Sequence, residues 1–259
     1  MTGFFVPGDG WLHRLHPWPK VLLVLAGVLA PFVVPIVALP VLIVAAAAGA
    51  LTAGLGRGYL RNLAIGTLPA VASILVVNGF FFPGAEDLLL ALGPFNLTRE
   101  GLAFGVPIAL RIVAAVAVTI AFVMSTRPDD LMEALIERGA SPKLAFVVLG
   151  AIQTIPRMHD KANRILDAQQ ARGLRTSGSF RARARAVVPL LGPLVIGSLI
   201  DVRERSLALE ARGFGARGAR TAYRVLRATP ADSVVSALGI LILVLLVVYA
   251  VARLAGLLP

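Results

Sequence analysis

Two short segments of the chain share a pattern that would place an arginine at the end of a helix. Residues 168–174 read Ala-Gln-Gln-Ala-Arg-Gly-Leu, and residues 208–214 read Ala-Leu-Glu-Ala-Arg-Gly-Phe. Glycine adopts the left-handed backbone conformation that stops a helix without a steric penalty, so Gly173 and Gly213 are predicted to follow a final helical turn. The shared pattern therefore predicts two helices that end in the same way.

The arginine before each of these glycines, Arg172 or Arg212, is predicted to point off an exposed helix end. Its guanidinium group carries a fork of donors that suits carboxylates and carbonyl oxygens. The small alanines one turn back, Ala168 and Ala208, leave space for another surface to approach closely, and Ala171 and Ala211 complete the two motifs. One copy alone is explained as an ordinary helix stop, because a cation is favoured near a helix C-terminus. Two copies, each ending an amphipathic segment, favour two contact points for a partner.

Few other residues have types or spacings suited to chemistry. Arg111 is the one basic residue within an apolar segment, where a charge is costly unless it faces protein or water. A structural role is predicted for it, pairing with carbonyl oxygens or with Asn78. The histidines His13, His16 and His159 form no metal-ligand spacing, so no metal site is assigned.

The sequence lacks the motifs of common catalytic sites. It contains no Gly-x-Ser-x-Gly, no phosphate-binding Walker-type loop, no cysteine and no pair of carboxylates within the apolar segments. Its 259 residues leave no room for an ATPase domain of ordinary size beside several membrane spans. We therefore assign no catalytic residue, expect no cofactor, and expect the energy source to be a partner.

The composition indicates that the bilayer is the main solvent of this chain. Hydrophobic residues make up 58% of the sequence, charged residues only 15%, and the mean hydropathy is +0.84. Soluble domains are roughly 45–50% apolar and about 25% charged. The formal net charge is +11, but the Lys and Arg residues are concentrated between the apolar segments, as the positive-inside rule predicts. A nucleic-acid partner is therefore not expected.

The apolar segments predict five membrane spans, with the N-terminus inside and the C-terminus outside. Residues 21–55 contain no charge, and about 35 residues are too many for one span of ~20. Three prolines, at positions 31, 35 and 40, interrupt this run and predict a hairpin of two helices. The remaining spans are predicted at residues 63–82, 101–124 and 234–252, with an outer loop between the first two of these.

Between the last two spans, the chain is predicted to form a helical cytoplasmic platform. Its two apolar stretches, residues 144–155 and 186–200, are too short for normal spans and suit helices at the interface or packed on other helices. An amphipathic segment follows each stretch, and its apolar or uncharged face is predicted to contact a membrane partner. The residues of these faces are Met158, Ala162, Ile165 and Gln169, then Leu199, Val202, Ser206 and Leu209.

The expected fold class is thus an all-α integral membrane protein in three parts. Residues 1–124 form the N-terminal spans, residues 125–231 the inserted helical region, and residues 232–259 the last span. Thr126, followed by Pro128 and Asp129, predicts the helix start that opens the middle part.

Taken together, these motifs resemble the T component of energy-coupling-factor transporters, the family that includes the membrane subunits of cobalt, nickel and biotin importers. The resemblance covers nearly the whole chain, and the two Ala-Arg-Gly motifs are its most specific elements. The segments that carry it are residues 12–17 with Lys20, Arg111, residues 125–131, residues 134–135, Ile155-Pro156, residues 165–173, Pro189-Leu190 and residues 208–214.

The resemblance implies three kinds of partner: two cytoplasmic ATPases, a small substrate-binding membrane subunit, and the lipid bilayer. Members of the family dock their Ala-Arg-Gly helices into grooves on the ATPases, which implies that residues 171–173 and 211–213 are the coupling residues here. This sequence departs from the family at His16, where an acidic residue is common, and at Ser125, where threonine is frequent. A third triplet, Ala216-Arg217-Gly218, makes Arg217 an additional candidate for docking.

The implied function is mechanical coupling in a bacterial plasma membrane, for uptake of a vitamin or a transition metal. ATP and magnesium would be used by the partner ATPases, and this chain would hydrolyse nothing. Two other classes of function stay open. An intramembrane lipid-modifying enzyme would need buried polar catalytic groups, of which the spans offer few. A stand-alone permease or scaffold would not need twin helices tipped with arginine.

Overall fold

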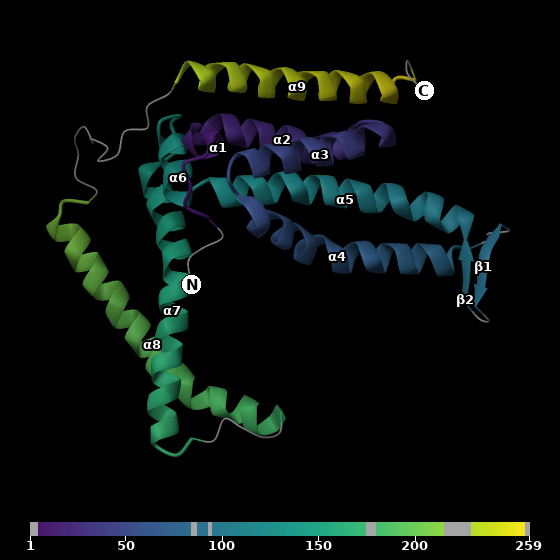
Figure 1. Cartoon of the computed structure of the whole chain (residues 1–259). Helices are drawn as coiled ribbons and strands as arrows, with labels where there is room; N and C mark the ends of the chain where they lie inside the picture. Colours follow the sequence, from purple (N-terminus) through teal and green to yellow (C-terminus); the bar gives the residue numbers. More distant parts are fainter. Residues whose placement is uncertain (1–4, 84–86, 93–94, 175–179, 215–228, 257–259) are drawn as a thin grey trace. The chain divides into compact units, whose positions relative to one another are not determined.

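A computed structural model describes residues 5–83, 87–92, 95–174, 180–214 and 229–256 (Figure 1). The chain divides into two compact units. We call residues 2–140 together with residues 226–259 the helical body, and residues 141–225 the inserted unit. The inserted unit interrupts the body between its last two helices, and each unit is described below by itself.

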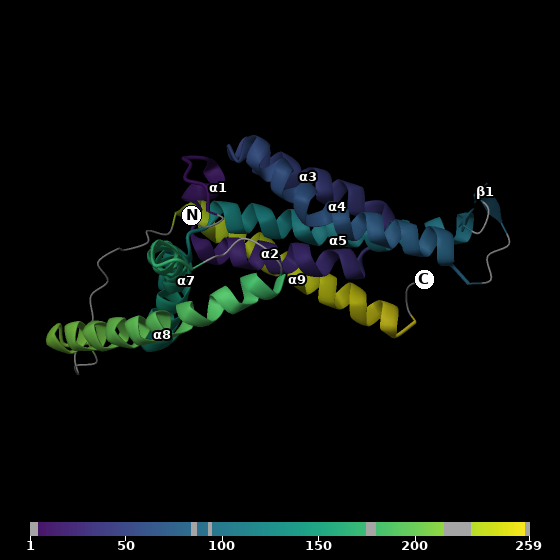
Figure 2. The ribbon, with the colours of Figure 1, turned by 90° about the horizontal axis from the view of Figure 1, so that it is seen from below.

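The helical body is built around one long helix, α5 (Arg99–Ser125), which packs against α2, α3 and α4. Helix α9 packs on α2, and the short α6 also contacts α2. Figures 1 and 2 show the long helices of the body running alongside one another. The other elements are α1 (Trp11–Arg14), α2 (Pro17–Val33), η1 (Ile36–Ala38), α3 (Leu39–Thr52), α4 (Gly56–Phe81), α6 (Pro128–Ile136) and α9 (Pro230–Leu254).

The length and apolarity of these helices fit a membrane protein. In the described part of the chain, Gly56–Phe81, Arg99–Ser125 and Pro230–Arg253 are long and apolar enough to cross a bilayer, with mean hydropathies of 1.9, 2.4 and 3.0. Two shorter apolar helices, Pro17–Val33 and Ile36–Thr52, form the hairpin that the prolines predict. The all-α fold class and its set of apolar helices are therefore confirmed.

A small β-hairpin lies where the sequence predicted an outer loop. Strand β1 (Leu88–Leu92) pairs antiparallel with β2 (Phe95–Thr98), with Leu88 opposite Thr98. The Thr98 hydroxyl accepts a hydrogen bond from the Gly101 amide at 3.3 Å and donates to the Gly79 carbonyl at 3.2 Å. The end of β2 thus caps α5 and ties it to α4.

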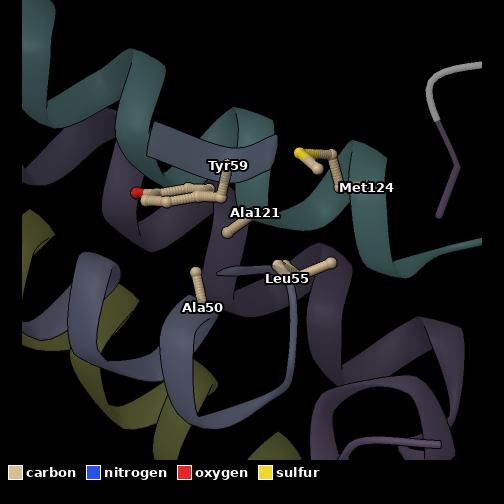
Figure 3. Close-up of a cluster of buried hydrophobic side chains, with 5 residues drawn as sticks. All are labelled: Ala50, Leu55, Tyr59, Ala121 and Met124. Carbon is tan, nitrogen blue, oxygen red and sulfur yellow. The ribbon is translucent and has the colours of Figure 1, made fainter. Parts of the chain in front are cut away.

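A buried cluster joins α3, α4 and α5 near the turn between α3 and α4. Figure 3 shows its five side chains, Ala50, Leu55, Tyr59, Ala121 and Met124. Tyr59 is fully buried, and its hydroxyl donates to the Ala117 carbonyl at 3.1 Å. The preceding turn contains Gly54 and Gly56 with positive φ angles of 83° and 51°, a conformation that glycine adopts without a steric penalty.

The inserted unit contains two long helices, α7 (Pro142–Ala171) and α8 (Phe180–Ala211). Each helix joins an apolar stretch to the amphipathic segment that follows it, so the stretch and the segment are one helix. Pro156 lies inside α7, and Pro189 and Pro193 lie inside α8, without ending either helix. Hydrogen bonding on both sides of each proline is sufficient to continue the helix across it.

Helix α6 begins one residue later than the sequence predicted. Its N-cap is Arg127, and Thr126 is instead the buried C-cap residue of α5. Pro128 occupies the first helical position, and a proline there requires the residue before it to be extended, which makes that residue the cap. Because α6 packs against α2, residues 125–140 belong to the helical body, whereas the sequence grouped them with the inserted region.

The Tyr59 cluster predicts a graded loss of stability. Tyr59→Phe should lower the free energy of unfolding by about 1 kcal/mol, because the hydrogen bond to Ala117 is lost while the ring still fills its site. Tyr59→Ala should cost about 3–5 kcal/mol, since it also leaves a cavity. Thermal unfolding in detergent, followed by circular dichroism, measures both effects. Leu60→Ala, whose side chain is 47% exposed, is the control, and a loss as large as that of Tyr59→Ala would contradict the assignment.

Candidate functional site

Helix α7 ends in the glycine stop that the sequence pattern predicts. Gly173 has a φ angle of 93°, and its amide donates to the Gln170 carbonyl at 2.9 Å. The Leu174 amide reaches back to the Gln169 carbonyl at 3.0 Å. These two bonds form a Schellman motif, which satisfies carbonyl groups that the last helical turn leaves unpaired.

Helix α8 ends with the same geometry. Gly213 has a φ angle of 69°, and its amide donates to the Glu210 carbonyl at 2.9 Å. The Phe214 amide donates to the Leu209 carbonyl, also at 2.9 Å. The prediction of left-handed glycines at both motifs is therefore confirmed.

A third stop of this kind ends α6, and the sequence analysis missed it. Gly139 has a φ angle of 93°, and the Gly139 and Ala140 amides bond the Ile136 and Leu135 carbonyls at 2.9 and 3.0 Å. The sequence signal for this stop is the Arg138-Gly139 pair after a helical segment. It lacks the preceding alanine that the other two motifs contain. An Arg-Gly helix stop is therefore not by itself a sign of partner binding.

What separates the three arginines is the surroundings of their side chains. The Arg138 guanidinium lies 4.2 Å from the centroid of the Trp18 ring, a cation–π contact inside the helical body. Arg172 and Arg212 are exposed, and neither has an ion pair with any residue that the structure describes. Within the described part of the chain, these donors are thus left for a partner.

The two exposed arginines lie at opposite ends of the α7–α8 pair. The Phe146 ring, in the second turn of α7, lies 4.8 Å from the ring of Phe214, just after α8 ends. Arg172 follows the other end of α7, and a helix rise of 1.5 Å per residue places it roughly 40 Å from the Phe146 end. Figures 1 and 2 show the two helices crossing between these ends.

The crossing of α7 and α8 is held by a few polar contacts. The Lys161 ammonium pairs with the Asp201 carboxylate at 2.7 Å, and the Ser198 hydroxyl lies 3.4 Å from the Met158 sulfur. A Cβ atom on Gly197 would lie 2.7 Å from Lys161 Cε and Nζ, so the missing side chain lets Lys161 lie across α8. The crossing therefore depends on a glycine and one ion pair.

This geometry corrects one premise of the sequence analysis. We expected the stripe of Met158, Ala162 and Ile165 to have nothing in the chain to cover it. Met158 instead lies at the crossing beside Ser198, and all three residues are partly buried. The premise was wrong because the pairing of α7 with α8, residues far apart in sequence, cannot be read from either amphipathic pattern alone.

Exposed apolar surface lies on both helices, and on α7 it includes Val147 and Ile155. On α8, Ile196 and Leu199 are 61% and 65% exposed, and Leu207 lies on the same side two turns later. By contrast, the groove at the crossing has a volume of about 830 Å³ and is lined largely by charged residues. An apolar partner would therefore meet an outer helix face, such as that of α8, and not the groove.

Arg111 does not make the predicted contact with Asn78. The Asn78 amide donates to the Ile74 carbonyl of its own helix at 2.9 Å, and Asn78 lies opposite Gly105 rather than Arg111. Among the described residues, no partner accepts from the buried Nε of Arg111. No group of three His, Cys, Asp or Glu that could hold a metal is found in the described parts either. Arg217 lies outside the described residues.

Comparison with known proteins decides the family. Residues 8–223 match the family described as CbiQ, cobalt transport protein. The chain belongs to the CbiQ family. The match covers the helical body up to α6 and nearly all of the inserted unit, including both Ala-Arg-Gly motifs, so the resemblance drawn from the sequence is confirmed. As a CbiQ family member, the chain is a multi-pass membrane component of a transport system.

Relatives of this CbiQ family member carry a more specific name. It is 30% identical over 256 residues to the energy-coupling factor transporter transmembrane protein EcfT of Listeria innocua, covering 90% of this chain and 91% of that one. The protein of the same name from Thermosediminibacter oceani is 31% identical over 245 residues, covering 89% and 90% of the two chains. The one from Bacillus subtilis is 28% identical over 248 residues, covering 90% and 91%.

The α7–α8 crossing predicts that two glycines in α8 differ in effect. Gly197→Ala should displace Lys161 from Asp201 and loosen the crossing, whereas a Cβ on Gly192 meets nothing within 4 Å. The chain contains no cysteine, so spin labels can be placed at Ala168 and Glu210 alone. Distances measured between these labels by pulsed electron paramagnetic resonance should broaden in Gly197→Ala and stay narrow in Gly192→Ala. Equal broadening in both variants would show that helix propensity, not the ion pair, controls the crossing.

Proposed function

We propose that this chain is the transmembrane coupling subunit of an energy-coupling-factor type importer. It passes the ATP-driven motion of two cytoplasmic ATPases to a small substrate-binding membrane subunit, for uptake of a vitamin or a transition metal. The chain itself is not an enzyme and binds no cofactor, and ATP and magnesium are used by the ATPases. The printed names of its relatives support this proposal.

The observation that carries the proposal is the pair of matched, exposed arginine tips. Each tip is fixed by a Schellman motif, and each lacks an ion-pair partner among the described residues. Their separation of roughly 40 Å follows from the length of α7. A globular domain of about 250 residues has a radius of gyration near 18 Å and hence a diameter of roughly 45 Å. The two tips therefore suit two separate domains, one tip for each.

The charge distribution gives the proposed orientation. Arginines and lysines are concentrated in residues 157–185 and 201–227, and such clusters are retained on the cytoplasmic side. The inserted unit and the N-terminus would then face the cytoplasm of a bacterial cell, and the C-terminus would lie outside. This placement makes Arg172 and Arg212 accessible to cytoplasmic ATPases.

For the substrate-binding subunit we propose the outer face of α8 as the main contact. Ile196 and Leu199 leave a large apolar area exposed. An area of this kind suits contact with an apolar partner in the membrane. Of the faces predicted from sequence, Ala162, Ile165 and Leu209 extend this contact beyond the crossing, while Met158 supports the crossing itself. Movement of the two arginine tips would thereby rotate the face of α8 that binds the substrate-binding subunit.

Removing the arginines tests the ATPase contact. Truncating one partner of a buried, hydrogen-bonded charge pair costs about 2–5 kcal/mol, which is roughly thirtyfold to several thousandfold in affinity. Arg172→Ala or Arg212→Ala should each weaken co-purification of the cognate ATPases and reduce uptake, and the double change should abolish assembly because two linked sites hold the complex. Lysine should substitute poorly at either position, because it lacks the planar fork.

Arg203→Ala is the matched control for these variants, since Arg203 is exposed on α8 about two and a half turns before Arg212 and belongs to neither tip. It should retain assembly and uptake. A double Arg172→Ala, Arg212→Ala variant that still bound both ATPases and transported normally would refute the coupling assignment.

A charge on the outer face of α8 should separate the two kinds of partner. Leu199→Asp is expected to release the substrate-binding subunit while the ATPases remain attached, because the carboxylate would be desolvated in the apolar contact. Asn163→Asp puts the same charge on an exposed position of α7 and should change neither partner. Pull-down of the assembled complex, with each partner quantified separately, is the measurement. Release of the ATPases alone would show that the outer face of α8 contacts the ATPases and not the substrate-binding subunit.

A further inference from the structure

His16 is a buried residue at the start of α2, and its ring is held on both sides. Only 8% of the residue is exposed. Its Nδ1 accepts a hydrogen bond from the Trp18 amide at 3.3 Å, as the N-cap of α2, and its Nε2 lies 3.3 Å from Glu137 Oε2. Because Nδ1 accepts a hydrogen bond from the backbone amide, Nε2 is the ring nitrogen that carries a proton and donates to Glu137. The ring thus links α2 to the residue that follows α6.

The backbone of the same residue is tied to α9. The His16 amide donates to Asp232 Oδ1 at 2.7 Å, and Asp232 is only 4% exposed. The other carboxylate oxygen accepts from the amide and the hydroxyl of Thr229, both at 2.7 Å, which completes the capping box of α9. A single buried carboxylate therefore caps α9 and holds its first turn against α2.

The two carboxylates that bond His16 lie close in sequence to the two points where the chain leaves and re-enters the helical body. Glu137 comes four residues before Ser141, where the inserted unit begins, and Asp232 comes seven residues after Val225, where it ends. The chain thus leaves the body and returns to it next to two carboxylates that bond the same residue. The contact of Arg138 with Trp18 adds a further link at the exit.

We propose that His16, Glu137 and Asp232 form an anchor for both chain connections of the inserted unit, and that this anchor is required for coupling. The inference rests on the proposed function. If these connections were not held in place, movement of the two arginine tips would only displace the connecting segments. It would then not be transmitted to α2 and α9. Asp232 is buried, and hydrogen bonds to buried charged groups are stronger than ordinary ones. The Glu137 side chain is 37% exposed, but it contacts a His16 ring that is itself buried. Together the two contacts hold the connections in place. The three residues are positioning residues and touch no partner.

The contacts of His16 with Glu137 and Asp232 differ from the charged pair at the start of α6. Arg127 and Asp129, at the start of α6, lie 3.8 Å apart with both side chains about half exposed. A pair of that kind contributes little because solvent screens it. Asp129→Ala is therefore the matched control, since it removes a carboxylate from α6 without touching the anchor.

The experiment uses the full transporter complex in proteoliposomes and measures substrate transported per ATP hydrolysed. Glu137→Ala removes the contact with the His16 ring, and Asp232→Ala removes the hydrogen bond to the His16 amide. Glu137→Gln keeps an acceptor for the His16 Nε2 proton. Each alanine variant should lower the ratio by about 2- to 30-fold, the usual range for residues that carry coupling, with ATPase binding unchanged. Glu137→Gln and Asp129→Ala should keep the ratio of the original protein.

Two outcomes would overturn the anchor. One is a normal ratio in both alanine variants, and the other is a loss of assembly or of membrane insertion in proportion to the loss of transport, which would show a purely structural role. If the unaltered chain binds no ATPase, the proposed function fails and a separate measurement still tests the anchor. Amide hydrogen exchange of the detergent-solubilised chain should then accelerate at residues 137–142 in Glu137→Ala and at residues 229–232 in Asp232→Ala, and unchanged exchange would refute it.

Discussion

Unpaired backbone groups at helix ends are the constraint on which this structure most depends. A helix leaves its last four carbonyls without partners inside the helix, and these groups must be satisfied by the turn that follows or by water. Helices α6, α7 and α8 all solve this with a left-handed glycine whose amide, and the amide after it, turn back to the final turn. The stop leaves the preceding arginine at the helix end, so the same backbone geometry that ends the helix also presents the guanidinium group.

At the opposite ends of helices, the unpaired groups are amides, and side chains satisfy them. Thr98 caps α5 and His16 caps α2, while Asp232 serves both α9 and the His16 amide. Because a carboxylate has several acceptor positions, one buried side chain can cap its own helix and bind a second. Capping in this chain is thus a means of joining helices as well as of ending them.

The two units use apolar surface differently. In the body, alanine, leucine and methionine side chains pack around Tyr59, and the outer faces of the long helices stay uncovered by protein, as in a bundle surrounded by lipid. In the inserted unit, α7 and α8 meet mainly through Lys161, Asp201 and their neighbours. An ion pair with one partly exposed carboxylate at such a crossing suits the role proposed for α7 and α8 in passing movement between partners.

Local properties of the chain were readable from sequence because they depend on residues a few positions apart. Apolar length predicts the membrane helices, prolines predict the hairpin of α2 and α3, and an Arg-Gly pair after an amphipathic segment predicts the left-handed stops at Gly173 and Gly213. The family was also evident from such motifs.

Contacts between distant segments were decided only by the tertiary structure. The bonds of His16 join residues 121 and 216 positions away, and no local pattern distinguishes Glu137 or Asp232 from other acidic residues. The same holds for Met158, whose place at the α7–α8 crossing depends on Ser198, 40 residues later. A helical face shows which residues lie together, but which neighbour covers it depends on how the whole chain packs. Only that packing showed that Arg138 lies over the Trp18 ring.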